Sequence, residues 1–225
     1  MAPTLQATRD VRRKQLLNGV GTLNWFQIPL TSNATIWVTN PVSNSGVFIP
    51  VTAKETFDLA KAWDCMPLTR AVSDRCHNEA VAKGTAFGLP SWKWDITDFD
   101  GYSKAISPTY GAKETTSILS GAHKVWVLST MKSKFSSKPK AVNYGFHYKG
   151  APTQGPSGAT LQRGFAVTQA LGTAHDGGHW DYSQMLQVMW GLEVDGTMLD
   201  LRTELLAGNP AIWDESTKLS AGDLP

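Results

Sequence analysis

The chain alternates short runs of strand composition with segments of helical spacing, and this mixture limits what it can fold into. The helix that is predicted second begins with Thr52 and Glu55, whose spacing is that of a capping box. The third begins at Pro67, a residue suited to the first turn of a helix. Helices are predicted over residues 7–18, 52–63, 67–83 and 197–206, and strands over 24–30, 35–39, 47–51, 123–128 and 141–148.

Long irregular segments separate these elements. Residues 84–120 and 149–165 are rich in glycine, proline and serine, and a short helix is predicted near 111–120. Residues 185–194 fit a strand or a helix. The chain has 225 residues, of which 41% are hydrophobic, enough for one sizeable core. We therefore predict an α+β fold, a single domain over 1–225 with helices packed on a mixed sheet.

Composition argues against several classes of partner. The formal net charge is +2 and the basic residues are spread out, so nucleic acid is not an expected partner. No run approaches the roughly 20 apolar residues that span a bilayer. The first residues lack an apolar signal core, so we expect a cytoplasmic protein as synthesised, released or exported only by a non-classical route. Cys65 and Cys76 are expected to be free thiols.

Histidines are concentrated in one part of the chain. Four of the five lie between His123 and His179, and the run from His175 to Ser183 adds two carboxylates and two glycines. Histidine exchanges a proton near neutral pH and is the commonest metal ligand. The run therefore marks the strongest candidate for a functional loop.

Several motifs resemble those of a family of uncharacterised bacterial proteins. Tyr144-Gly145-Phe146-His147 is similar to the family's Tyr-Gly-Trp-His. His175 with Asp181-Tyr182-Ser183 is similar to its His-x5-Asp-Tyr-Ser-His-Gly, although Gln184 replaces the second histidine. Ala122-His123-Lys124, Thr69 and Asp74 also match. The resemblance implies a shared site but names no reaction; its members here would be His123, His147, His175, Asp181 and Ser183.

These residues suggest a hydrolase acting on a cell-wall (peptidoglycan-like) or other polar polymer. His147 would be the base, and Asp181 would orient it or His175. The nucleophile is open between Cys65, Ser183 and an activated water. Cys65 precedes a predicted helix, whose dipole would lower the pKa of the thiol. The sequence around it also resembles the nucleophile turn of papain-like cell-wall cysteine peptidases.

Two alternatives remain open. Zinc could be bound by His175, His179 and Asp181 in a loop, completed by His123 or His147. No other cofactor is predicted. A non-catalytic glycan-binding or structural module would instead use the chain's tryptophans, which suit a sugar face because they combine apolar area with one donor. The candidates, in or near predicted loops, are Trp92, Trp94, Trp180, Trp190 and Trp213. The oligomeric state is not predicted.

An acidic triplet, Asp95, Asp98 and Asp100, superficially resembles a calcium-binding loop. Such a loop requires a glutamate at its twelfth position, and here Ile106 occupies it. We therefore predict a turn at the triplet.

Overall fold

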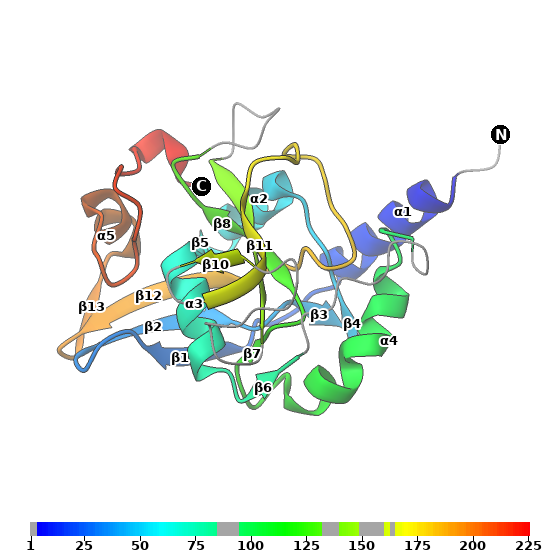
Figure 1. Ribbon diagram of the computed structural model, residues 1–225, viewed down its shortest axis with the longest axis horizontal. Helices are drawn as coiled ribbons and strands as arrows, with labels where there is room; N and C mark the ends of the chain where they lie inside the picture. Colours follow the sequence, from blue (N-terminus) through cyan, green and yellow to red (C-terminus); the bar gives the residue numbers. More distant parts are fainter. Residues whose placement is uncertain (1–3, 85–94, 132–139, 149–159, 163–164) are drawn as a thin grey trace.

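The computed structural model describes residues 4–84, 95–131, 140–148, 160–162 and 165–225 (Figure 1). Helices and antiparallel strands both contribute, which confirms the predicted α+β class. Most of the predicted irregular segment 149–165 lies outside the described residues, as do Trp92 and Trp94. Among the described residues, no helix is long and apolar enough to cross a membrane.

One larger sheet combines strands from the N-terminal part of the chain with strands from its C-terminal part. Its strand order is β1-β2-β12-β13, and β5 also pairs with β12; all pairings are antiparallel. Side chains alternate across it, so Ile36 and Val38 are buried on the inner face while Trp37 lies on the other. Its strands are β1 (Trp25–Pro29), β2 (Ala34–Thr39), β5 (Met66–Pro67), β12 (Val188–Val194) and β13 (Thr197–Leu199).

The second larger sheet contains the motif Tyr144 to His147. Its order is β10-β11-β9-β8, again antiparallel throughout. Residues of β8 and β9 are all buried, so both faces of these two strands are covered. The strands are β8 (Lys124–Leu128), β9 (Ala141–His147), β10 (Thr160–Gln162) and β11 (Phe165–Gly172).

Two short strand pairs and the helices complete the described chain. β3 (Ser43–Asn44) pairs with β4 (Val47–Phe48), and β6 (Ala82–Lys83) pairs in parallel with β7 (Leu119–Ser120). The helices are α1 (Leu5–Asn18), α2 (Ala53–Ala62), α3 (Arg70–Glu79), α4 (Phe99–Tyr110) and α5 (Leu201–Ala207), with short 3₁₀ turns at Gly111–Lys113 and Ala221–Asp223.

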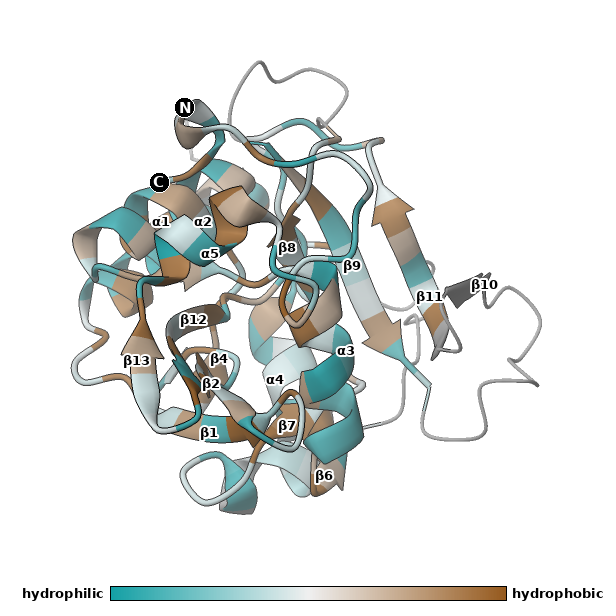
Figure 2. Ribbon diagram, turned by 90° about the vertical axis from the view of Figure 1, so that its left-hand side faces the viewer, coloured by the Kyte–Doolittle hydropathy of each residue, from teal (hydrophilic) through white to brown (hydrophobic). Residues whose placement is uncertain are grey.

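Helix α3 packs between the two larger sheets. It contacts β1 of the first larger sheet and β8 and β9 of the second, and in Figure 2 it lies below β9. The main hydrophobic core is formed there, from Ile36 and Val38 of β2, Val72 and Cys76 of α3, and Val125 and Val127 of β8. This position places the polar residues of α3 against β9.

Helices α1 and α2 are joined by a buried arginine. The Arg13 guanidinium donates to both carboxylate oxygens of Glu55, at 2.6 and 2.9 Å, and to the carbonyl oxygen of Pro50. It also lies 4.9 Å from the ring centre of Trp180, which ties the histidine-rich loop to these helices. The predicted capping box is confirmed, since Thr52 and Glu55 bond reciprocally at the start of α2.

Four element predictions differ from the structure. The short helix expected near 111–120 is a 3₁₀ turn at Gly111–Lys113, and Leu119–Ser120 form β7. The helix predicted over 67–83 begins only at Arg70, after the N-cap Thr69, because Met66–Pro67 pairs with β12. Residues 99–110, expected to be irregular, form α4, which has Asp98 as N-cap. Of the acidic triplet, Asp95 and Asp98 flank the turn before this helix, whereas Asp100 lies in its first turn. Residues 197–199, expected to be helical, form β13.

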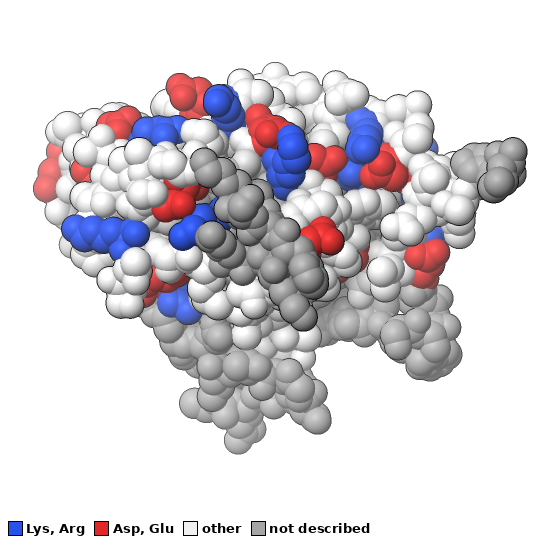
Figure 3. All heavy atoms as spheres, turned by 90° about the horizontal axis from the view of Figure 1, so that it is seen from above, with Lys and Arg blue, Asp and Glu red and all other residues white. Residues whose placement is uncertain are grey.

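Charges of both signs are interspersed on the face of the molecule that Figure 3 shows, without a basic stripe. Among the described residues, charged side chains also pair between helices or within one, such as Arg12 with Asp100 and Lys54 with Asp58. Surface pairs of this kind contribute little to stability.

Candidate functional site

The backbone of the Tyr144–His147 motif leaves regular strand geometry. Gly145 has φ 131° and Phe146 has φ 54°. In a regular strand, residues three apart point to opposite faces. Here the Tyr144 hydroxyl and His147 Nε2 both reach Asp74 Oδ1, at 2.6 and 2.8 Å. The two positive φ values therefore turn His147 to the face that Tyr144 occupies.

Close packing against β8 explains the glycine in this motif. A Cβ on Gly145 would lie 2.9 Å from both the carbonyl oxygen of His123 and the Cα of Lys124. Phe146 N donates to that same carbonyl, at 2.8 Å. A bulky residue with positive φ costs about 1–3 kcal/mol, and such strain is concentrated at functional sites. The strained backbone of this motif thus fixes the position of the His147 imidazole.

Asp74 and His77 come from the same face of α3, because they are three residues apart. The His77 ring stacks on the His147 ring, with centroids 4.7 Å apart and planes 16° from parallel. Its Nε2 lies 3.2 Å from the carbonyl oxygen of Tyr148, which can only accept, so Nε2 carries the proton. Its Nδ1 then accepts from Ser120 Oγ, at 3.1 Å.

We call this group the Asp74 cluster; its members are Asp74, His77, Tyr144 and His147. All four are buried, Asp74 being 4% and His147 2% exposed. Burial, followed by the neighbouring His147, lowers the pKa of His77 to about 3. His77 is therefore neutral at neutral pH. The cluster pairs one carboxylate with two imidazoles, of which His77 takes up no proton at neutral pH.

His123 is held by other partners. Tyr110 Oη lies 2.8 Å from its Nδ1, and Gln187 Oε1 lies 2.8 Å from its Nε2. Because the Gln187 amide nitrogen donates to the carbonyl of Thr39, its oxygen is the acceptor for His123. Burial lowers the pKa of His123 to about 4. Both ring nitrogens are thus bonded in the neutral form, which suits a supporting role.

The histidine-rich loop forms a second group, the loop cluster: Lys124, His175, His179, Asp181 and Ser183. Asp181 Oδ2 lies 2.6 Å from Lys124 Nζ, and its Oδ1 accepts from the backbone and the hydroxyl of Ser183. Burial alone would raise the pKa of Asp181, but His179 and Lys124 hold it well below its usual range. His179 Nε2 is 3.7 Å from Asp181, beyond hydrogen-bond distance.

The two loop histidines are half-buried and stack face to face, with centroids 3.9 Å apart. Burial, and then His179 and Lys124, lower the pKa of His175. Among the described residues, no group of three or more His, Cys, Asp or Glu side chains is arranged to hold a metal ion.

The residues predicted to share one site therefore lie in separate groups. His147 is oriented by Asp74, so the expectation that Asp181 orients it is wrong. His175 and Asp181 do belong to one cluster, together with Ser183. The two groups separate because the positive φ angles at Gly145 and Phe146 turn His147 toward α3. The histidine-rich loop instead packs against Lys124, through Asp181.

Neither Cys65 nor Ser183, the two predicted nucleophiles, has the surroundings that would activate it. Cys65 is buried, and burial, then Asp64, raises the pKa of its thiol to about 12. It precedes β5 and not the first turn of a helix, so the expected activation by a helix dipole is absent from this thiol. Ser183 is also buried, and its hydroxyl donates to Asp181 in a local turn.

The sequence motifs indicate only part of the Asp74 cluster. Asp74 matches a motif without a predicted role, and His77 and Tyr144 are not among the predicted site residues. The signal was present: Thr69 is a helix N-cap residue, and Asp74 and His77 follow it at helical spacing.

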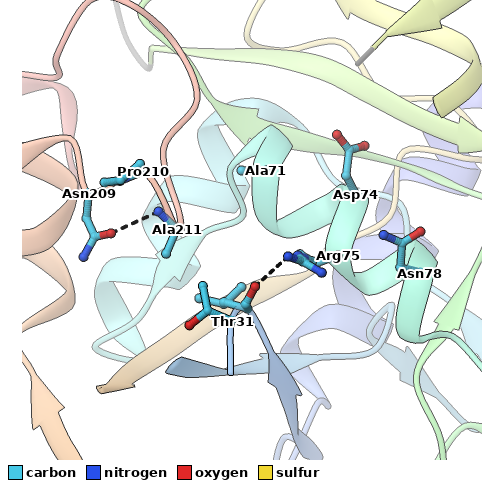
Figure 4. Close-up of a pocket in the computed structure, with 9 residues that line it drawn as sticks. Thr31, Ala71, Asp74, Arg75, Asn78, Asn209, Pro210 and Ala211 are labelled. Carbon is cyan, nitrogen blue, oxygen red and sulfur yellow. Dashed lines mark hydrogen bonds between the residues drawn. The ribbon is translucent and has the colours of Figure 1, made fainter. Parts of the chain in front are cut away.

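A cavity of about 560 Å³ adjoins α3 next to the Asp74 cluster. Its wall includes Asp74, Arg75 and Asn78 of α3, facing Thr31 and the segment 209–211 (Figure 4). In Figure 4 the Asp74 carboxylate points away from Thr31, on the side where Tyr144 and His147 bind it. The cavity has the volume of a small-molecule site, about 300–1,000 Å³.

Comparison of the chain with family models, with curated proteins and with solved structures gave no match.

Proposed function

We propose that this chain is a hydrolase that cleaves a polar, cell-wall-like (peptidoglycan-like) polymer with water activated by His147. One observation supports this most strongly: Asp74 Oδ1 accepts hydrogen bonds from both Tyr144 and His147, in a buried cluster built on a strained strand. Such pairing of carboxylate and imidazole is how general bases are oriented.

The carboxylate selects the tautomer of His147. Because Asp74 accepts from Nε2, the proton of the neutral ring lies on Nε2 and the lone pair on Nδ1. When Nδ1 takes a proton, Asp74 stabilises the imidazolium that forms. The Tyr144 hydroxyl donates to the same oxygen and disfavours transfer of the proton to the carboxylate.

Water is the nucleophile in this proposal, since the Cys65 thiol is neutral and the Ser183 hydroxyl is bound to Asp181. His147 Nδ1 takes one proton from water, and the water oxygen bonds to the carbonyl carbon of an amide. The carbon–nitrogen bond then breaks, and the leaving nitrogen receives the proton from His147. His77 stays neutral beside it, so the proton is shared with no second imidazole.

The test is release of soluble amino groups from purified bacterial cell wall, compared between the wild type and two variants. Loss of the base or of its carboxylate, in His147→Gln or Asp74→Asn, is expected to slow release by about 100-fold or more. His175→Asn, in the loop cluster, is the matched control and should stay within a few-fold. Thermal unfolding of each variant confirms that it folds.

Two outcomes would overturn the hydrolase. One is full activity of His147→Gln. The other is a wild-type protein that is retained on cell wall and releases nothing, which is the behaviour of a glycan-binding module. Loss of activity only in His175→Asn would move the reaction to the loop cluster.

A further inference from the structure

Four tryptophans from distant parts of the chain meet on the opposite face of the first larger sheet from α3. Trp25 of β1, Trp37 of β2 and Trp190 of β12 are joined by Trp63, which follows α2. Among the described residues, these four alone line a cavity of about 340 Å³. Trp190, 45% exposed, was one of the tryptophans predicted to meet a sugar; Trp180 and Trp213 are buried in the core.

Strand register brings these rings together. Trp190 lies directly opposite Trp37 on the neighbouring strand, and the Trp25 and Trp190 rings are 6.3 Å apart at an angle of 53°. Cross-strand neighbours on one face of a sheet lie close enough for aromatic contact. The rings are therefore fixed by the sheet, and only Trp63 comes from outside it.

A bulge in β12 exposes Trp190. The register between β12 and β2 shifts between Trp190 and Leu192, and Gly191 has φ 62°. A Cβ on Gly191 would lie 2.4 Å from the terminal methyl of Met198. The extra residue directs Trp190 outward and returns Leu192 to the core. Bulges of this kind re-aim side chains near functional sites.

A row of polar groups borders the tryptophans. Gln27, which lies opposite Trp37, donates through its amide to the Thr35 hydroxyl at 2.8 Å and to the Glu193 carboxylate at 3.3 Å. Thr35 and Glu193 are a cross-strand pair on the same face. Two residues of a strand span about 6.6 Å, so this row runs next to the indole rings.

We infer that this cavity binds a pyranose ring of a polysaccharide. The apolar C–H face of the sugar packs on the indole rings, and its hydroxyls bond to Gln27, Thr35 and Glu193. The cavity is large enough for one small ligand, at about 300 Å³ or more. A quaternary ammonium is less well matched, because no carboxylate lines the described cavity and the Glu193 carboxylate accepts from Gln27.

The inference rests on the proposed function only for the identity of the polymer. The inner face of this sheet packs on α3, so the tryptophan cavity and the Asp74 cluster lie on opposite sides of it. The cavity therefore anchors the polymer and does not hold the bond that is cleaved.

The experiment measures binding of a β-1,4-linked N-acetylglucosamine tetramer by intrinsic tryptophan fluorescence. The wild type should show a saturable change. Trp190→Ala should bind roughly tenfold more weakly, the loss of one ring contact. Val11→Ala changes another exposed apolar residue, on α1, and is the control; it should bind like the wild type. His147→Gln should also bind normally.

Three results would overturn the inference: no response to the tetramer, a response to choline chloride only, or a Trp190→Ala variant that loses self-association in sedimentation but binds the sugar unchanged. The two proposals fail separately. If His147→Gln keeps full turnover while Trp190→Ala loses sugar binding, the cavity stands and the catalytic proposal falls.

Discussion

At the scale of the residue, two backbone φ angles set the geometry of the Asp74 cluster. Positive φ at Gly145 and Phe146 brings Tyr144 and His147 to one carboxylate. Phe146 carries the strain and Gly145 makes the close approach to β8. Their contribution is geometric, because Gly145 has no side chain and the Phe146 ring has no hydrogen-bonding atom.

The change Gly145→Ala tests this geometry. Its Cβ would meet two backbone atoms at 2.9 Å in addition to the unfavourable φ, so we expect a loss of at least about 3 kcal/mol in the free energy of unfolding. Gly46→Ala is the control: its φ of 75° is also positive, but nothing lies within 4 Å, and about 1 kcal/mol should be lost. Urea unfolding measures both, and equal losses would contradict the role assigned to Gly145.

At the scale of the element, local signals predicted local structure. The Thr52–Glu55 capping box marked α2, and strand composition found β1, β2, β8 and β9 within a residue or two. Helix α4 was missed because Gly101 and Pro108 oppose a helix, whereas burial of Tyr102, Ile106 and Tyr110 favours one.

The hairpin before α5 has a local sequence signal in its Asp195-Gly196 pair. Asp195 and Gly196 both have positive φ and connect β12 to β13, the arrangement that an Asp-Gly pair favours. The site was harder to predict. Composition pointed to His147, but the partner Asp74 lies 73 residues away, and no periodic pattern shows that a strand reverses its face.

At the scale of the whole molecule, buried neutral histidines make stability depend on pH. An imidazole in the unfolded chain has a pKa of about 6.5. In the folded protein the pKa is about 3 for His77 and about 4 for His123, chiefly because of burial. Below pH 6.5 the unfolded chain therefore binds protons that the folded protein does not, and folding becomes less favourable as pH falls.

The free energy of unfolding should decrease between pH 6.5 and about 4, with a slope approaching about 1.4 kcal/mol per pH unit for each of these imidazoles. Urea unfolding at pH 7.5 and 5.0 measures the decrease. A His123→Gln variant should show a shallower slope, since it has one fewer such group. Stability that is equal at both pH values, or greater at pH 5.0, would refute the argument.

The proposed general base depends most on which ring nitrogens of His77 and His147 carry protons. Nitrogen-15 spectra of the histidine rings, recorded between pH 7.5 and 5.0, observe that state directly. We expect His147 to carry its proton on Nε2 at pH 7.5, as its bond to Asp74 requires, and His77 to stay neutral throughout. Titration of His77 near pH 6.5, or a neutral His147 with its proton on Nδ1, would contradict the proposed base.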